Sequence, residues 1–566
     1  MHEFTVAALG AILLAVAMTW PILRHPFRTI PQDIYDPTFF AWLIAWDGHA
    51  LLRNPATHNL FDIWNTNVMF PEQRTLAFSD SLLGYAPFGA LGSGPEAALF
   101  EYNLLWVLSF AMAAFGAYAL VRQLGATRAA AVVVAVAFAY SPWRFTHGGH
   151  LNILSTGGIL LAFAMLARGH GWSLKSGYSP EKVRPYWALA GWLTAAWQVT
   201  LGFALGISFV YVLAAIGLVA VLGWLFAGRP RLPARLVAAD LGGGLLFLGI
   251  TAAMAYPYLK VLAEHPDAQR SVAWVELFSP PFRGFLTAGD NSWLWGAVQQ
   301  EYRGTLLTAG EMALLPGFAL LALAALGLLV SSWSLKVRLA LAAGVVGTVW
   351  MALGTKSPGH GKYGYLLLYD HLPGFDGSRT PGRLVLWAIV LLCIMAAGTL
   401  TGLQHHLTRE RPATQRVRRR ALPALAVLVV SLSLVAVVAE GVNKTPHPDV
   451  PVAPVALSTL TAPVLVLPTD ELADFRVMLW STDGFPQVAN GSSSYNPPTR
   501  ETLRKAMLTF PDAQSVGMLR NLGVKTVLVL PEAAGSPYAP ALAKSGAPFG
   551  LQRSDRNGTV AFTISP

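Results

Sequence analysis

Residues 203–226 read FALGISFVYVLAAIGLVAVLGWLF, an apolar run without a charged side chain. A helix through this run is long enough to cross the roughly 30 Å hydrocarbon core of a bilayer. The whole chain of 566 residues has the same character, since 54% of its residues are hydrophobic and 12% are charged. Soluble domains are about 25% charged, so this composition excludes both a purely soluble fold and a disordered chain. The sequence predicts an α-helical polytopic membrane protein.

Further apolar runs flank this one on both sides. The full set covers 4–22, 99–121, 129–143, 151–167, 187–201, 203–226, 237–254, 311–332, 339–354, 384–402 and 422–439. The stretch from Trp187 to Phe226 is too long for one helix, and Gln198, Gly202 and Gly206 mark the turn that divides it. We therefore expect about eleven transmembrane helices, in a membrane domain over residues 1–440. The single cysteine, Cys393, lies in one of these runs and excludes a disulfide framework.

The basic residues indicate the orientation of the bundle. Alternate connections are rich in Lys and Arg and almost free of acid, at 122–128, 168–184, 229–235, 336–338 and 409–420. Such loops stay in the cytoplasm, which predicts a multi-pass protein of the cytoplasmic (inner) membrane with its N-terminus inside and its C-terminal domain outside. The net charge of +10 is concentrated in these loops, so the basic run 416–420 is better explained by anchoring and contact with membrane lipids than by binding of nucleic acid.

With this orientation we expect a long first loop, 23–98, and a C-terminal domain, 441–566, on the outer face of the membrane. In the loop, Thr38–Leu52 and Thr75–Leu91 are apolar but too short to span, and we expect two helices in the membrane interface. The alternative is that both are packing helices that cap the bundle. The C-terminal domain has strand-like runs at 464–467, 525–530 and 559–564, and a helix that starts at Pro511 and Asp512 and ends at Gly523, which predicts a small α/β domain.

Polar residues gather directly after the first apolar run, where residues 31–38 read PQDIYDPT. Asp33 and Asp36 lie three residues apart, just outside the bilayer. A carboxylate here is suited to act as a general base toward an acceptor hydroxyl, or as a ligand of a divalent metal. The competing explanation is that Asp36 only caps the helix that Pro37 begins.

A second polar cluster lies in the turn SPWRFTHGGHLN, residues 141–152, between two apolar runs. Arg144, His147 and His150 crowd this short connection. Polar residues at membrane depth are costly and commonly functional, and Arg and His both donate to phosphate oxygens. The alternative is that Arg144 merely extends toward the interface.

A third cluster, DGSRTPGR at 376–383, leads directly into the apolar run 384–402. Arg379 and Arg383 are suited to an anionic lipid headgroup, and positive charge on the outer face runs against the topology rule. The outer loop 256–310 offers four candidate acids, with three tryptophans as candidate sugar-stacking platforms; a solvated loop with interfacial aromatics is the simpler explanation. Those acids are Glu264, Asp267, Glu276 and Asp290.

Together these segments resemble the GT-C class of membrane glycosyltransferases, and more closely the bacterial multi-span proteins of the YfhO type. The resemblance rests on Asp36-Pro37 with AWLIAW at 41–46 and HAL at 49–51, Phe70-Pro71 with LAFS at 76–79, SPWR at 141–144 with His147 and His150, RTPGR at 379–383, and NLGVKTVLV at 521–529. It implies transfer of a sugar from a polyprenyl-phosphate donor on the outer membrane face. The family's catalytic base maps to Asp36 or Asp33. The strict Asp-x-Asp or Glu-Asp pair of several families is absent, so the need for a metal stays open.

The expected activity is that of an inverting glycosyltransferase with a cell-envelope glycan, lipid or protein as acceptor. Arg144, His147, His150, Arg379 and Arg383 are the candidates for holding the lipid phosphate, where positive charge stabilises the leaving group. Two alternatives remain, a lipid-linked glycan transporter (flippase) and a non-catalytic assembly partner in the membrane. A transporter more often has broken helices in two related halves, and the sequence contains no internal repeat.

Overall fold

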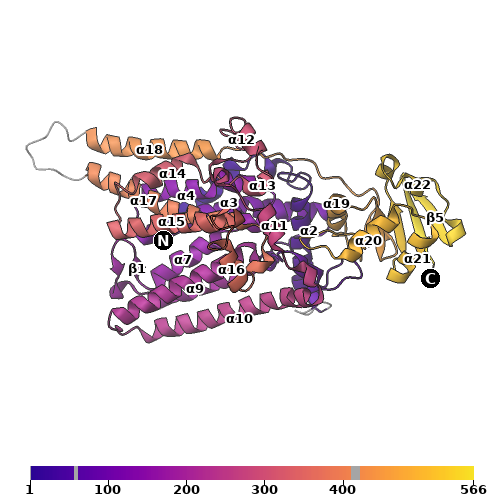
Figure 1. Ribbon diagram of the computed structural model, residues 1–566, viewed down its shortest axis with the longest axis horizontal. Helices are drawn as coiled ribbons and strands as arrows, with labels where there is room; N and C mark the ends of the chain where they lie inside the picture. The colour runs from indigo at the N-terminus through magenta and orange to yellow at the C-terminus, as the bar shows by residue number, and fades with distance from the viewer. Residues whose placement is uncertain (1, 57–61, 409–420, 557, 566) are drawn as a thin grey trace, which may run out of the picture.

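The computed structural model describes residues 2–56, 62–408, 421–556 and 558–565. Its main part is a bundle of apolar helices that run along the long axis of the molecule, with a smaller α/β module at one end (Figure 1). The basic run 416–420, which we interpret as an anchor, lies outside the described residues.

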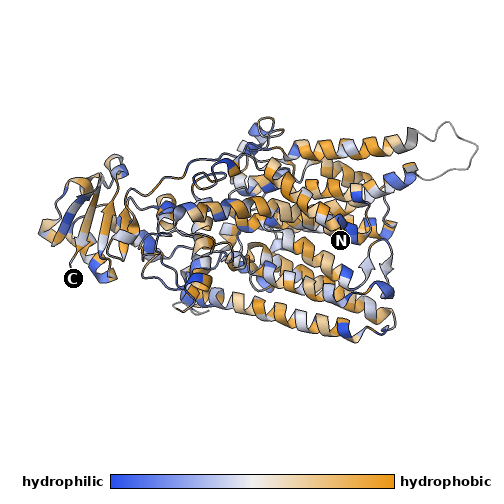
Figure 2. Cartoon of the chain, turned by 180° about the vertical axis from the view of Figure 1, so that it is seen from behind, coloured by the Kyte–Doolittle hydropathy of each residue, from blue (hydrophilic) through white to orange (hydrophobic). Residues whose placement is uncertain are grey.

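Every predicted apolar run contains a helix. The helices are α1 (His2–Met18), α3 (Pro95–Leu124), α4 (Arg128–Ala139), α7 (Gly157–Gly169), α8 (Pro185–Val199), α9 (Phe203–Phe226), α10 (Ala234–Glu264), α14 (Phe318–Leu326), α15 (Leu335–Ala352), α17 (Val385–Thr408) and α18 (Ala421–Gly441). Within the described residues, eight helical spans are long and apolar enough to cross a membrane, three of them after joining a short neighbouring helix. The remaining helices, α1, α8 and α14, are shorter. Hydrophobic residues line the lengths of the helices, as a multi-pass membrane protein requires (Figure 2).

The predicted break inside Trp187–Phe226 is confirmed. Gly202 adopts a φ of +127°, which favours glycine, between the end of α8 and the start of α9. The Asp80 carboxylate lies against it and accepts hydrogen bonds from the backbone N–H groups of Phe203 (2.6 Å) and Ala204 (3.1 Å). A side chain from the first outer loop thus satisfies the free backbone donors of α9.

The N-terminus and the C-terminal module lie at opposite ends of the bundle (Figure 1). Glu3 pairs with Arg122 (2.6 Å) and Arg128 (2.8 Å), so α1 begins beside the first basic connection. The N-terminus and the basic connection 122–128 therefore lie at the same end of the bundle. Which end faces the cytoplasm stays a prediction from the charge pattern.

The first outer loop differs from the prediction of interfacial helices. Its one α-helix of ordinary length, α2 (Asp36–Gly48), is buried from Pro37 to Gly48 between the bundle and the module, where Phe39 contacts Phe475 at 5.9 Å between ring centroids. The packing-helix alternative is therefore correct for α2. Residues 75–91 form only two short 3₁₀ turns, Thr75–Phe78 and Leu83–Tyr85, so the predicted helix is wrong there. Gly84 and Pro87 interrupt any longer helix.

The C-terminal module is a four-stranded sheet with helices, residues 464–565. Its strands are β3 (Val464–Leu467), β4 (Thr526–Val529), β5 (Leu551–Arg556) and β6 (Thr559–Ile564), in the order β3-β4-β6-β5, with β3 and β4 parallel. The helices are α19 (Glu471–Trp480), α20 (Pro498–Met507) and α21 (Ala513–Leu522). Asp512 caps α21 and Gly523 ends it at a φ of +81°, as predicted. The division into domains at residue 440 stays a prediction.

Candidate functional site

The glycine pair in the turn 147–150 lets two polar segments meet. Trp106 Nε1 donates to the carbonyl of Gly148 at 2.7 Å, and a Cβ added at Gly148 would lie 2.9 Å from Gln32 Oε1. Because the turn packs so closely on the PQDIYDPT segment, His150 Nε2 lies 3.0 Å from Asp36 Oδ2. Two residues predicted separately from the sequence therefore form one pair.

Asp36 does not act as the cap of its helix. The N-cap position of α2 is Tyr35, without a side-chain cap hydrogen bond, and the Asp36 carboxylate contacts His150 instead. Burial favours the neutral acid, but the hydrogen bond and charge of His150 outweigh it and hold the pKa of Asp36 below its usual value. Burial likewise opposes the charge on His150, and the Asp36 carboxylate raises the pKa of that imidazole. The pair favours an ionised Asp36.

Asp33, the rival carboxylate, has a different environment. Its Oδ1 accepts a hydrogen bond from the backbone N–H of Tyr35 at 2.9 Å, which fixes the local turn. Burial, followed by the neighbouring charge of Asp36, raises the pKa of Asp33. Asp33 is thus engaged by the backbone, whereas Asp36 faces the histidine turn.

Arg383 forms a bidentate pair with Glu311, a residue that sequence reasoning missed. Arg383 Nη2 and Nε donate to the two Glu311 oxygens at 2.5 and 3.2 Å. The Arg383 side chain is 18% exposed and that of Glu311 14% exposed. Burial opposes ionisation of Glu311, but the charge of Arg383 and its hydrogen bond to the carboxylate bring the pKa of Glu311 down to about 2. The only signal in the sequence was an acid at the first position of an apolar run.

His147 lies fully buried within this cluster. Its ring centroid is 5.4 Å from that of Trp143 and 5.5 Å from that of His150. Neither ring nitrogen has a hydrogen-bond partner among the residues that the structure describes. Burial lowers the pKa of His147 to about 3, so the imidazole is neutral at physiological pH and offers one donor and one acceptor.

Arg144, by contrast, points into the bundle. Its three guanidinium nitrogens donate to the carbonyls of Ala139 (3.0 Å) and Leu154 (2.7 Å) and to Thr156 Oγ1 (2.7 Å). Both carbonyls belong to residues at helix ends, Ala139 at the end of α4 and Leu154 at the end of a short helix, Leu151–Leu154. The structure does not bring Arg144 together with the other candidates, and we leave it out of the proposal below.

Arg379 lies half-buried over two aromatic rings. The guanidinium carbon is 4.8 Å from the ring centre of Phe278 and 5.4 Å from that of Trp274. Within the described part of the chain it makes no hydrogen bond or ion pair. Burial, and then the charge of Arg383, lowers the pKa of Arg379. Its charge also interacts with Glu311 and Asp36, which places all these groups in one electrostatic neighbourhood.

The described residues do not supply three protein ligands for a metal at one place. No group of three or more His, Cys, Asp or Glu side chains among the described residues is close enough to hold an ion. Asp36 is engaged with His150 and Glu311 with Arg383. We derive no step through a metal.

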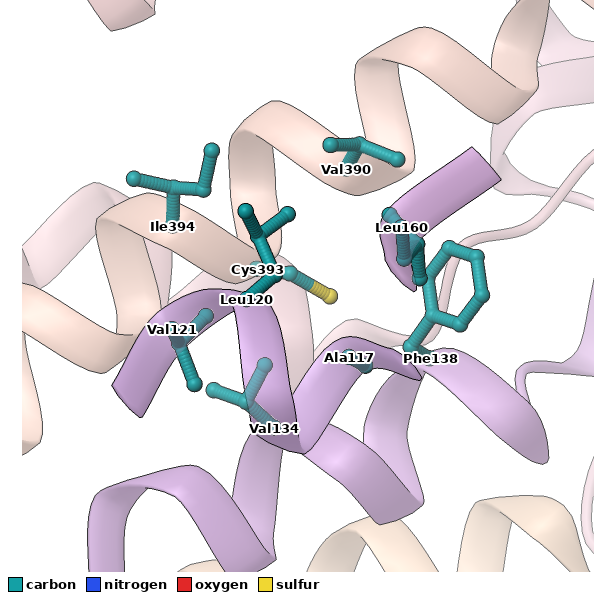
Figure 3. Close-up of a pocket in the computed structure, with 9 residues that line it drawn as sticks. All are labelled: Ala117, Leu120, Val121, Val134, Phe138, Leu160, Val390, Cys393 and Ile394. Carbon is teal, nitrogen blue, oxygen red and sulfur yellow. The ribbon is translucent and has the colours of Figure 1, made fainter. Parts of the chain in front are cut away.

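Two pockets differ in chemistry. One, a small cavity of about 20 Å³, adjoins Arg383 and is lined by the start of α9, by Tyr365 and Phe375, and by Ser378 and Thr380. The other lies inside the bundle, where the thiol of Cys393 projects among apolar side chains (Figure 3). The described part of that second pocket contains no charged group.

Comparisons with known proteins found distant structural neighbours. No protein-family model and no curated protein matches the chain. A solved structure of the oligosaccharyltransferase AglB from Archaeoglobus fulgidus, in complex with an inhibitory peptide and a dolichol-phosphate, is 14% identical with a TM-score of 0.42, over 99% of this chain and 74% of that one. ArnT from Cupriavidus metallidurans, bound to undecaprenyl phosphate, is 15% identical with a TM-score of 0.40, over 99% and 97%. At these levels of similarity, function has to be argued from the site itself.

Proposed function

We propose that the chain is a membrane glycosyltransferase that moves a sugar from a polyprenyl-phosphate donor to a cell-envelope glycan, lipid or protein. The observation that carries this proposal is the pairing of Asp36 with His150 in the same electrostatic neighbourhood as Arg379 and the Glu311–Arg383 pair. A carboxylate held ionised and an arginine without a carboxylate partner are the two groups that such a transfer needs.

The reaction follows from these groups. Asp36 accepts the proton of the acceptor hydroxyl, whose oxygen attacks the anomeric carbon of the donor. The bond from that carbon to the phosphate oxygen breaks, and its electron pair leaves with the phosphate. Arg379 stabilises the negative charge that develops there. A single displacement inverts the anomeric centre.

The cavity beside Arg383, of about 20 Å³, is too small to enclose a sugar. Its lining combines aromatic and aliphatic side chains with the hydroxyl groups of Ser378 and Thr380, so it offers these groups as contacts at its mouth only. In this arrangement Glu311 holds Arg383 at the rim and Arg379 is available to the phosphate.

The direct test is transfer by the purified chain in lipid nanodiscs. Radiolabelled polyprenyl-phosphate sugars are incubated with cell-envelope extract, and label is followed into acceptor and into free sugar. Label transfer that is lost in Asp36→Asn supports the proposal. Movement of intact donor across proteoliposomes, without transfer, would favour the transporter, and neither activity would favour the assembly partner.

A further inference from the structure

Arg270 is a second arginine without an acidic partner at the same end of the bundle. It lies between a short turn at Pro266–Ala268 and the helix α11 (Val272–Leu277). Its backbone N–H donates to the carbonyl of Asp376 at 3.1 Å, so it lies beside the segment that carries Arg379. Its Nη2 donates to the carbonyl (2.5 Å) and the hydroxyl (3.0 Å) of Ser494 in the C-terminal module.

The charges of Arg270 and Arg379 oppose each other. Burial, and then the charge of Arg379, lowers the pKa of Arg270 to about 10, and no carboxylate contributes to that shift. The acids that interact with Arg379 are Glu311, Asp36 and Glu471. Glu311 is already paired with Arg383, Asp36 with His150, and the Glu471 side chain is 67% exposed. The two guanidinium groups are thus left unneutralised, a costly state at a half-buried position.

The surroundings keep both guanidinium groups in place despite this repulsion. Trp274 and Phe278 lie against the Arg379 guanidinium, and its N–H groups have no hydrogen-bond partner among the described residues. Ser494 takes up one nitrogen of Arg270, and the adjacent Tyr495 hydroxyl contacts both carboxylate oxygens of Asp267 at 3.0 Å. These contacts hold the loop that carries Arg270 against the C-terminal module.

We propose that Arg270 and Arg379 together bind one phosphate group, and that this is the phosphate of the polyprenyl donor. The identity of the donor rests on the function proposed above; the two-arginine anion site does not. An oxyanion between the two guanidinium groups removes their repulsion and accepts charge-assisted hydrogen bonds from both. In this arrangement the C-terminal module contributes to donor binding through Ser494.

The test measures binding of tritiated polyprenyl phosphate, without a sugar, to the full chain in nanodiscs. Losing one charge-assisted hydrogen bond should weaken binding by roughly 10- to 150-fold in Arg270→Gln and in Arg379→Gln. Arg270→Lys should recover part of the loss, since it keeps the charge without the fork. Arg283→Gln is the matched control, an exposed arginine of the same outer loop that donates to the carbonyl of Thr305, and it should bind like wild type.

Competition identifies the source of the phosphate. Unlabelled polyprenyl phosphate should displace the probe, whereas phosphatidylglycerol and inorganic phosphate at the same concentration should not. Equal displacement by phosphatidylglycerol would overturn the donor assignment. Wild-type binding by Arg270→Gln, in protein with an unchanged melting temperature, would overturn the site. If Arg270→Gln melts early, normal binding by Arg379→Gln and Arg270→Lys overturns it equally. Arginine-dependent binding without any sugar transfer would refute the proposed function and leave this inference standing.

Discussion

Glu311→Gln is the most informative single change, because it removes a charge and keeps the shape of the side chain. The Glu311 and Arg383 side chains are 14% and 18% exposed and share two hydrogen bonds. Water and salt screen such a pair weakly. Removing one partner of a buried pair leaves the other charge uncompensated, at a cost of about 3–5 kcal/mol. We expect Glu311→Gln to lower the free energy of unfolding by about 3 kcal/mol.

The double variant tests whether the lost stability comes from the interaction between Glu311 and Arg383 or from each residue alone. Arg383→Gln alone should cost a similar amount, because it strands the buried carboxylate. With both residues changed to Gln, neither charge is stranded, so the double variant should cost no more than either single variant. A double-mutant cycle should therefore give a coupling free energy of at least about 3 kcal/mol, the upper end of the usual range for contacting residues.

Chemical unfolding in mixed detergent micelles measures these differences. The matched control is the exposed pair Glu501–Lys505, whose side chains are 60% and 71% exposed. Glu501→Gln should change the free energy of unfolding by less than about 0.5 kcal/mol, as for other exposed pairs one helical turn apart. If Glu311→Gln costs no more than this control, or if the cycle is additive, the pair does not anchor the site.

Three further predictions concern the chemistry and the topology. Asp36→Asn should reduce turnover by about 10²- to 10⁴-fold, measured by label transfer. The melting temperature and polyprenyl-phosphate binding should not change. Loss of turnover in Asp33→Asn alone would assign the role of the base to Asp33. His150→Gln should move the acidic limb of the pH–rate profile to higher pH, because burial then raises the pKa of Asp36 without the opposing imidazole. If the acidic limb does not move, His150 does not control the pKa of the general base. A reporter fused after Pro566 should be active only outside the cytoplasm, and cytoplasmic activity would reverse the predicted orientation.

The parts of the fold that were predictable depend on local sequence. The apolar runs identify the helices because the bilayer requires each span to satisfy its own backbone hydrogen bonds. Gly202 separates two helices because its φ of +127° is unfavourable for other residues. Asp512 and Gly523 delimit α21 because both act within one helical turn of its ends.

The features that the sequence did not predict depend on contacts between residues far apart in the chain. The apolar face of α2 looks interfacial in isolation, and its burial follows from packing on α19, more than 400 residues later, through Phe39 and Phe475. Strand β5 was missed because its sequence, LQRSDR, has no apolar alternation. It forms through pairing with β6 from Leu551 to Arg556 alone.

The site was predictable residue by residue, but its pairing was not. Asp36 and His150 were both candidates, and the 3.0 Å contact between them depends on the close approach of Gly148 to Gln32. Glu311 was missed because its importance comes only from Arg383, which lies in another outer loop. No local pattern reveals that one acid will be buried beside one particular arginine.

Arg379 and Arg383 show how tertiary structure separates two residues that the sequence treats alike. Both lie in the same short segment, and both were candidates for the lipid phosphate. Glu311 neutralises Arg383 and fixes its orientation, whereas Arg379 contacts only aromatic faces and neighbouring charges. An arginine already engaged by a buried carboxylate must break that pair to bind a phosphate fully, and breaking it costs several kcal/mol. Arg379 has no such cost, so it is the arginine of this segment that is available to an anion, and Arg383 contributes by holding the rim of the pocket in place.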